Sequence, residues 1–368
     1  MQHLTQSVLA SNLVPSQHKI PPVTIGVDLG DTESHYCLID SEGNITGRGR
    51  LRTTAKAFGK FFAEYAGCRV AYEVGTHSAW VTNVLESIGC ETIVANARKV
   101  ALISKNERKN DTCDSELLAR LARVDPRLLS PIQHRSVETR SHQAILRARD
   151  ALVRARTQLI NCTRGLVKPI GSRITGCSSA SFHKQAGAQI PDELKPATDP
   201  LLEAIRELTA RIRVFDKTIE RLCEEEYPET KLLRQVAGVG PLTALAYVLA
   251  IEDPSRFARS RTIGAYLGLV PRQRDSGKRE PQLRISKSGD GHVRRLLVGS
   301  AQYILGPFGP DCDLRRFGAA IASRGGKNAK KRAAVAVARR LAVLLHRLWT
   351  TSAEYEPLRH AGRAKKPA

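Results

Sequence analysis

The 368-residue sequence predicts a protein of the α/β plus α class. Three observations support this prediction. Short β-branched segments alternate with helical patterns over residues 23–130, two apolar stripes with heptad spacing follow over 136–226, and further helical patterns fill 229–352. Hydrophobic residues make up 42% of the chain, which is enough for folded cores and excludes a disordered basic protein.

The first predicted domain contains short strands and helices. Strands over 23–28, 36–39 and 45–51 follow one another closely, which favours an antiparallel meander. After these strands, helices and strands are predicted to alternate. The predicted elements are a helix over 55–66, a strand over 69–73, a helix over 78–88, a strand over 91–95, and helices over 97–106 and 113–123. A meander followed by alternating helices and strands is typical of a ribonuclease-H-like sheet.

Two long helices are predicted next, each with an apolar seam of three heptads. The helix over 136–168 is followed by a Gly-, Ser- and Pro-rich segment, 171–197, that we interpret as a loop. The second helix opens with Asp199 as N-cap and Pro200 in the first turn. We expect a coiled-coil hairpin that also dimerises. The seams are Ile145, Ala148, Leu152, Ala155, Leu159, Cys162 and Leu166, and Leu201, Ile205, Leu208, Ile212, Phe215, Ile219 and Leu222.

The third domain, 229–352, is predicted to be mostly helical. Gly238-Val239-Gly240-Pro241 before an apolar helix is similar to the turn of a helix-hairpin-helix element. Helices are expected over 262–268, 290–305 and 328–349, with a polar basic loop over 271–289.

The two ends of the chain are interpreted as segments outside the three predicted domains. Residues 1–22 lack a basic region followed by an apolar block, so we interpret them as a loose leader, and 353–368 as a basic tail. No run of about 18 apolar residues occurs, so we expect no membrane span. The eight cysteines are scattered without a CxxC pair, which excludes a zinc ribbon and favours a reducing cytoplasm.

Positive charge is concentrated in the second half of the chain. The formal net charge is +22, yet residues 23–124 carry 13 Lys and Arg against 13 Asp and Glu. Residues 1–22 add +1, so 125–368 hold +21. A surplus of this size in folded sequence indicates a polyanionic partner, most simply nucleic acid, although a generally basic proteome is an alternative.

Four acidic residues form the first candidate site. Asp28 and Glu73 end the first and fourth predicted strands, which are neighbours in a ribonuclease-H-like sheet. Asp111 and Asp114 share one face at the opening of a helix. Four converging carboxylates require cations, and oxygen ligands suit Mg²⁺ or Mn²⁺, which can assist phosphodiester cleavage.

Each acid also has an ordinary interpretation. Asp111 and Asp114 are typical helix-capping residues, and Asp28 fits a turn. We predict the metal site because the four acids occur together on this strand order. His35 and His77 lie close by in sequence and are interpreted as structural.

The second candidate site is the basic loop that contains Ser276. A serine next to glycine and flanked by arginines can attack phosphorus while the arginines bind phosphate oxygens. Local sequence alone favours a phosphate-contacting or solvated serine, and Ser260, Ser286 and Ser288 are chemically equal candidates. Further phosphate contacts are expected at Arg272, Arg274, Lys278, Arg279, Gly238, Gly240, Lys330, Lys331, Arg339 and Arg340.

The motifs of the chain, taken in order, resemble those of a known family. IGVDLG, AYEVGTHS, KNDTCDSELLARL, VAGVGPLTALA, YLGLVPRQRDSG and ISKSGDGHVRRLL occur in this order between about residues 23 and 350. The set resembles the IS110 family of insertion-sequence transposases, which is related to Piv-type DNA invertases. The resemblance implies a RuvC-like domain with a D-E-D-D tetrad, a coiled coil, and a transposase domain with a catalytic serine.

The resemblance also assigns roles. The tetrad matches Asp28, Glu73, Asp111 and Asp114, and the serine matches Ser276, which follows Asp275 here. Ser276 would form a phosphoserine link to DNA, assisted by Mg²⁺ or Mn²⁺ at the tetrad. The implied partners are donor and target DNA, a non-coding bridge RNA that base-pairs with both, and further copies of the chain in a dimer to tetramer. The implied location is the bacterial cytoplasm, at the nucleoid during activity.

Three alternatives stay open at this point. The first is a Piv-like invertase without a guide RNA, and the second a RuvC-like nuclease that uses water as the nucleophile. The third is a non-catalytic nucleic-acid-binding protein with a decayed site. The four intact acids argue against the third alternative.

Overall fold

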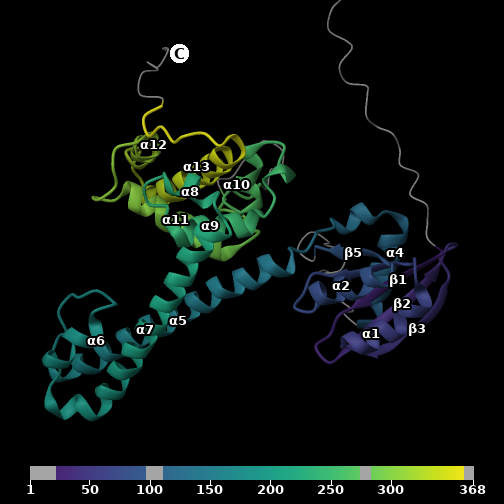
Figure 1. Cartoon of the computed structure of the whole chain (residues 1–368), viewed down its shortest axis with the longest axis horizontal. Helices are drawn as coiled ribbons and strands as arrows, with labels where there is room; N and C mark the ends of the chain where they lie inside the picture. The colour runs from purple at the N-terminus through teal and green to yellow at the C-terminus, as the bar shows by residue number, and fades with distance from the viewer. Residues whose placement is uncertain (1–21, 97–110, 274–282, 360–368) are drawn as a thin grey trace, which may run out of the picture. The chain divides into compact units, whose positions relative to one another are not determined.

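The computed structural model describes residues 22–96, 111–273 and 283–359 (Figure 1). The chain divides into two compact units, with the boundary between His134 and Arg135. The first unit is mixed α/β and the second is helical, so the α/β plus α class is confirmed. No helix within the described ranges combines the length and the apolar character that crossing a membrane requires.

The first unit is built on one five-stranded sheet. Its strands are β1 (Val23–Asp28), β2 (Glu33–Asp40), β3 (Ile45–Arg52), β4 (Arg69–Glu73) and β5 (Glu91–Ala95). Their order is β3-β2-β1-β4-β5. The first three strands form the predicted antiparallel meander, and β4 is parallel to both β1 and β5. The predicted neighbouring position of β1 and β4 is therefore confirmed.

Helices cover both faces of this sheet. Helices α1 (Ala55–Phe62) and α2 (Ser78–Ser87) pack on the face to which Ile25 and Val27 point. Helix α4 (Asp111–Val124) packs on the opposite face. Because side chains alternate along a strand, Gly26 and Asp28 of β1 point to the α4 face. The helix predicted over 97–106 lies outside the described residues.

Gly26 permits α4 to lie directly on β1. A Cβ atom at this position would be 1.9 Å from the backbone oxygen of Ser115 and 2.5 Å from the backbone nitrogen of Ala119. Real atoms never approach so closely, so only glycine fits here. The absence of a side chain at Gly26 thus fixes where α4 lies along β1.

The second unit begins with the predicted hairpin of α5 (Val137–Val167) and α7 (Lys195–Glu225). The predicted N-cap of α7 was wrong. The helix starts four residues before Asp199, Pro196 takes the first turn, and Pro200 lies inside the helix. A proline in the first turn loses no hydrogen bond, so Pro196 can begin the helix, and Pro200 costs one bond in the second turn.

The predicted seam of α5 was also wrong, by one residue. Ile160 and Val167 are buried, whereas Cys162 and Leu166 of the predicted seam are exposed. On α7 the prediction was better, since Ile205, Ile212, Ile219 and Leu222 are buried as expected, and Leu201, Leu208 and Phe215 are half-buried.

Polar contacts at the middle of the hairpin account for this displacement. Arg149 Nε donates to Asp216 Oδ1 at 2.5 Å, and Arg156 Nη1 donates to Thr209 Oγ1 at 3.3 Å. Burial lowers the pKa of Arg156 from its ordinary value. The hairpin therefore packs through polar pairs at its centre, and Ala148, Cys162 and Leu166 of the predicted seam stay exposed.

The segment predicted as a loop between the two helices carries a small core of its own. It contains the short helix α6 (Phe182–Gln185) and several 3-10 turns. Phe182 and Ala186 are fully buried against Val167 and Ile205 of the hairpin. The segment is irregular as predicted, yet it packs against the ends of both helices.

The remaining helices of the second unit enclose its main core. They are α8 (Thr230–Arg234), α9 (Pro241–Ile251), α10 (Ile263–Tyr266), α11 (Gly291–Leu305), α12 (Asp313–Ala322) and α13 (Ala329–Thr351). Helix α9 is buried on nearly all sides, from Thr243 to Ile251. Helix α12 was not predicted, because Pro and Gly residues around 306–310 obscure its start. Beyond α13, Pro357 O accepts a bond of 2.7 Å from Asp313 N, so part of the predicted tail packs on the unit.

Candidate active site

Asp28 and Glu73 lie side by side at the carboxyl ends of β1 and β4. The two strands are paired in parallel up to Val27 and Tyr72, and the two acids are the next residues on each strand. Both acids are half-buried. Ala71, two residues before Glu73, packs with Leu118 of α4, so Glu73 points to the same face as Asp28.

Helix α4 supplies the third carboxylate at this edge. Asp114 is 8% exposed and lies one residue before Ser115, whose carbonyl group contacts the backbone of Gly26. The Oδ1 atom of Asp114 is buried and has no hydrogen-bond partner among the described residues. Asp111 begins α4 one helical turn earlier. The side chain of Asp111 lies outside the described part of the chain.

The chemistry of these residues suits a divalent cation, although the ligand atoms of Asp28, Glu73 and Asp114 do not all lie within 4.8 Å of one another in the described part of the chain. A buried carboxylate oxygen without a donor is costly, and it is stabilised by a positive charge. Asp28 and Glu73 add two further carboxylates on the same face of the sheet. A site of oxygen ligands suits Mg²⁺ or Mn²⁺, and Asp28, Glu73, Asp111 and Asp114 are the residues that would hold it.

Two histidines lie at the same edge of the sheet. His35 is the cross-strand partner of Asp28. Trp80 Nε1–H donates to His77 Nδ1 at 3.1 Å, which leaves the ring proton on Nε2, 3.0 Å from Asp31 Oδ1. The sequence did not predict this Trp80–His77–Asp31 chain; the spacing of three residues between His77 and Trp80 in a helix was the available signal.

Ser276, Asp275, Arg274, Lys278 and Arg279 lie outside the described residues. The two ends of this segment are joined: Arg272 N donates to Arg284 O at 3.0 Å, and Ser286 N donates to Val270 O at 2.9 Å. Arg272 itself is exposed. The described residues on its two sides, 270–272 and 284–286, thus form a short antiparallel pairing.

The other candidate serines have structural partners. Ser286 and Ser288 hydroxyls are 3.0 Å apart. His346 is buried, and its Nε2 atom lies 3.1 Å from Pro254 O, which can only accept, so Nε2 carries the proton. Nδ1 therefore accepts from the Ser260 hydroxyl at 2.9 Å. Ser260 is consequently the one of these three serines that is paired with an imidazole.

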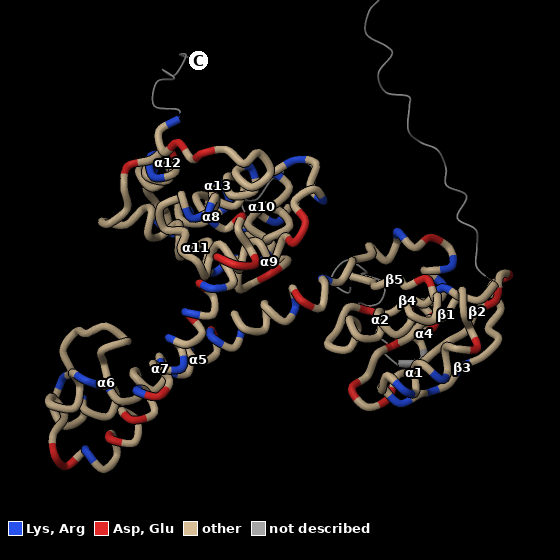
Figure 2. Tube along the Cα trace, viewed as in Figure 1, with Lys and Arg blue, Asp and Glu red and all other residues tan. Residues whose placement is uncertain are grey.

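The predicted basic contacts on α13 are exposed. Lys330, Lys331, Arg339 and Arg340 all reach the surface of the second unit, and Figure 2 shows Lys and Arg along its helices. The guanidinium carbon of Arg340 lies 3.3 Å from the centre of the Phe317 ring, and burial lowers its pKa. Arg340 is therefore partly engaged within the unit.

The glycine turn has a clear structural role. Gly238 has φ +84°, and a Cβ there would lie 2.9 Å from the Tyr303 ring and 3.1 Å from Ser300 O. The turn between α8 and α9 therefore packs closely on α11. Gly240 is the N-cap of α9 and has open space around it, so the backbone there is accessible to an anion.

A second cluster of possible metal ligands was not predicted. Glu138 and His142 lie one turn apart on α5, and Glu226 follows α7. Ligand atoms of the three lie within 4.8 Å of one another. The Tyr227 hydroxyl lies 2.8 Å from His142 Nδ1, and burial raises the pKa of Tyr227 to about 12. The i, i+4 spacing of Glu138 and His142 was the signal available in the sequence.

Comparisons with known proteins place the chain in a family. Residues 25–171 match the DEDD transposase model of IS110 elements, and residues 230–310 match the transposase model of the IS116/IS110/IS902 family. The chain is 30% identical to the transposase for insertion sequence element IS1111A of Coxiella burnetii over 339 residues, which cover 90% of each protein. The chain belongs to the IS110 family of insertion-sequence transposases.

Two further relatives agree with this assignment. The IS110-family chain is 28% identical to a probable family 20 transposase of Pseudomonas aeruginosa over 287 residues, covering 76% of this chain and 83% of the relative. It is 27% identical to the transposase for insertion sequence element IS1328 of Yersinia enterocolitica over 289 residues, covering 77% and 84%. The predicted family is confirmed.

The buried Asp114 oxygen leads to a prediction about metal-dependent stability. We expect Asp114→Asn to melt no lower than wild type without metal, because the change removes a buried charge that lacks a donor. Mn²⁺ at 100 times its dissociation constant should stabilise wild type by about 2.7 kcal/mol and the variant by much less. Thermal melts with and without Mn²⁺ measure both effects.

Glu116→Gln is the matched control for this prediction. Glu116 lies on the same helix but pairs with Arg48 and Arg120, so its loss should leave the Mn²⁺ response intact. An undiminished Mn²⁺ response in Asp114→Asn would show that Asp114 does not hold the ion.

Proposed function

We propose that this IS110-family transposase cuts and rejoins DNA strands with Ser276 as nucleophile, assisted by a divalent-metal site at Asp28, Glu73, Asp111 and Asp114 in a RuvC-like domain. The observation that supports this most strongly is the placement of Asp28 and Glu73 in register on adjacent parallel strands, with the unpartnered Asp114 oxygen on the helix that covers them. Asp111 begins the same helix.

The proposed step is a transfer of a phosphoryl group. A bond forms between Ser276 Oγ, which loses its proton to a base, and the phosphorus of a DNA strand. The bond from phosphorus to one nucleoside oxygen breaks, and that oxygen takes up a proton. Attack by another strand's hydroxyl on the phosphoserine reverses these changes and rejoins DNA. Mg²⁺ or Mn²⁺, when bound, supplies positive charge for the phosphate oxygens.

Ser276→Ala separates this proposal from a RuvC-like nuclease. We expect the variant to bind DNA within about two-fold of wild type but to form no covalent protein–DNA adduct, because the attacking oxygen is gone. Denaturing gels with end-labelled DNA detect the adduct. Asp28→Asn should lose cleavage as well, because it removes a metal ligand.

Ser260→Ala is the matched control, because the Ser260 hydroxyl is paired with His346. The control should retain the adduct. Loss of the adduct in Ser260→Ala rather than Ser276→Ala would move the nucleophile to Ser260, and strand cleavage by both variants without any adduct would favour water attack.

We also propose that a bridge RNA guides the choice of DNA. The charge distribution supports this: residues 23–124 are neutral, whereas 125–368 carry +21, a surplus that suits phosphate contacts with more than one nucleic acid. Base pairing by the RNA would then supply sequence choice, and the protein would bind mostly phosphates. The Piv-like alternative needs no RNA.

Purification from the host tests the guide directly. We expect one discrete RNA, encoded beside the transposase gene, to co-purify and to be released by high salt, because phosphate contacts weaken by roughly three or more decades over a modest salt increase when 6–10 phosphates are engaged. Sequencing of the bound RNA is the measurement. Random RNA, or none, would favour the invertase.

A second copy of the chain is proposed to cover the outward stripe of α5. This stripe is the open part of the predicted heptad seam: Ala148, Cys162 and Leu166 are exposed in the single chain and Leu152 is half-buried, whereas Ile145 and Leu159 pack within the unit. A seven-residue apolar repeat of this length fits another helix. We therefore propose a dimer through α5, with a tetramer during strand exchange.

Light scattering after size-exclusion chromatography tests the dimer. We expect Ala148→Glu with Leu166→Glu to shift the protein to monomer, because both substitutions place charge on the outward stripe. Ala151→Glu with Asn161→Glu changes exposed residues beside the stripe and should leave the mass unchanged. A dimer that survives the first pair would require another interface.

A further inference from the structure

The second unit contains an open groove between the glycine turn and α11. Its volume is about 560 Å³, within the range that binds small organic ligands. Val236 and Leu296 contribute to an apolar floor. Gly240 and Gly299 also line it, and neither has an atom near the position of a Cβ, so the groove stays open to solvent there.

Two arginines and two hydroxyl-bearing residues make the groove suitable for binding an anion. Arg234 and Arg295 line it together with Thr243 and Ser300. Arg295 is held by Asp150 at 2.7 Å, which fixes its guanidinium but offsets part of its charge. Arg234 is exposed and forms no ion pair among the described residues. Arg234 is therefore the cation best placed to bind a phosphate.

Tyr303 forms an aromatic wall of the groove. Its side chain is 46% exposed, although the backbone at Gly238 contacts the ring edge closely. Such a tyrosine ring is held at one edge and is otherwise open to solvent, so it forms a preformed surface for stacking. Binding then costs little conformational entropy, because the ring has few orientations to lose.

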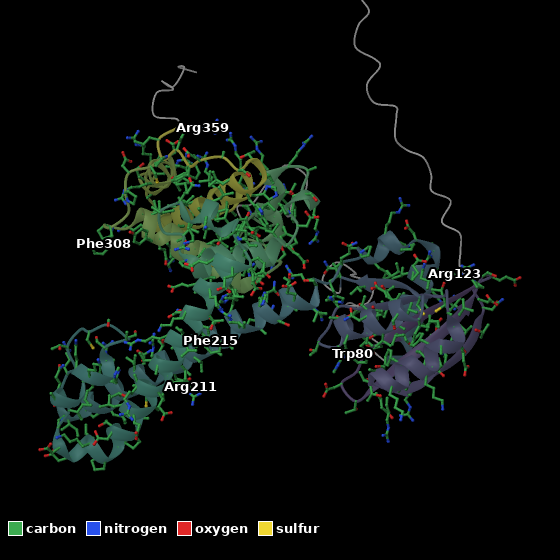
Figure 3. All side chains as sticks on the ribbon, viewed as in Figure 1. Trp80, Arg123, Arg211, Phe215, Phe308 and Arg359 are labelled. Atoms are coloured by element: carbon green, nitrogen blue, oxygen red, sulfur yellow. The ribbon has the colours of Figure 1, made fainter. Side chains whose placement is uncertain are left out.

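A second aromatic ring lies a few residues further along the chain. Phe308 is 82% exposed and projects from the loop after α11 (Figure 3). Arg315 Nη1 donates to the carbonyl groups of Ile304, Gly306 and Gly309 at 2.6–3.0 Å, which fixes the loop. A single exposed phenylalanine is ordinary on a protein surface, and on a fixed loop it presents a ring face that is available for stacking.

We propose that this groove binds an unpaired nucleotide of single-stranded DNA, with its base stacked on Tyr303 and its phosphate at Arg234, and that Phe308 stacks a neighbouring base. Alternation of aromatic faces and cations is the recognised means of holding single strands. A paired base offers no free face, so a duplex would engage only the arginines. The choice of DNA rests on the proposed function, in which strand exchange separates paired strands.

Binding of fluorescein-labelled dT12 to the full-length protein tests the groove, with the dT12·dA12 duplex as the paired comparison and U12 as the RNA comparison. EDTA prevents cleavage. We expect Tyr303→Ala to weaken dT12 binding by roughly 5- to 150-fold, the effect of losing one stacked base, and to change duplex binding by less than about two-fold. Tyr303→Phe should bind like wild type, because the ring face is retained.

Leu358→Ala, which trims another exposed apolar side chain of the same unit, is the control and should change neither value. A second readout does not depend on a variant: photo-crosslinking of wild type to dT12 containing 5-iododeoxyuridine, followed by peptide mass spectrometry, should identify Tyr303 or Phe308. The proposal would be overturned if Tyr303→Ala bound dT12 like wild type, lost affinity equally for dT12 and the duplex, or lost affinity for U12 alone. Crosslinks to other residues would overturn it as well.

These outcomes are independent of the chemistry assigned to Ser276. Binding is measured without metal and without cleavage, so a failure of the serine mechanism leaves the result unaffected. Conversely, a Tyr303→Ala protein that still forms the DNA adduct but binds dT12 like wild type would remove the groove while retaining the proposed function.

Discussion

The contact between α4 and β1 at Gly26 determines the arrangement of the first unit. No side chain fits between the strand and the backbone at Ser115, so the helix lies against the strand at one fixed level. That level places Asp114, one residue earlier, near the carboxyl end of the strand on which Asp28 follows Gly26 by two residues. A short-range steric constraint thus places acids that are 86 positions apart in the sequence at the same edge of the sheet.

The second unit is held together by both polar and apolar contacts. Its hairpin is joined by polar pairs such as Arg149–Asp216 at the centre and by apolar clusters at both ends. Ala148, Cys162 and Leu166 on α5 are exposed among the described residues of the single chain, and the surface of the last helix is basic. Both features suit an assembly on nucleic acid, in which a second chain covers the stripe and phosphates cover the charge.

Residues whose environment is decided locally could be predicted from the sequence. Strands β1 and β4 follow from β-branched runs that end in an acid, and their neighbouring position follows from the meander before them. Asp28 and Glu73 lie at the ends of these two strands, as predicted, whereas the role of the four acids stays a prediction. The close packing of α4 on Gly26 was not predicted, because a glycine that permits close contact looks the same in the sequence as a glycine in a turn.

Features that depend on distant partners were missed or misplaced. The seam of α5 was displaced by one residue because the apolar pattern does not distinguish a helix of the same chain from one of another chain. Asp199 and Pro200 have the pattern of a helix start, and so do the residues around Pro196 four positions earlier. The hydrogen bond of Ser260 to His346 joins residues 86 positions apart, so local pattern offers no signal for it.

Our main inference is that the position of α4 on β1 assembles the proposed metal site. It is tested most directly by calorimetric titration of Mn²⁺ into Gly26→Ala, a variant that keeps all four acids, with Gly59→Ala as the control because a Cβ there meets no atom within 4 Å. The account predicts that Gly26→Ala, while still folded by circular dichroism, binds Mn²⁺ at least about ten-fold more weakly, a loss of roughly 1.4 kcal/mol, and that Gly59→Ala binds it like wild type. Equal Mn²⁺ affinity in a folded Gly26→Ala protein would contradict it.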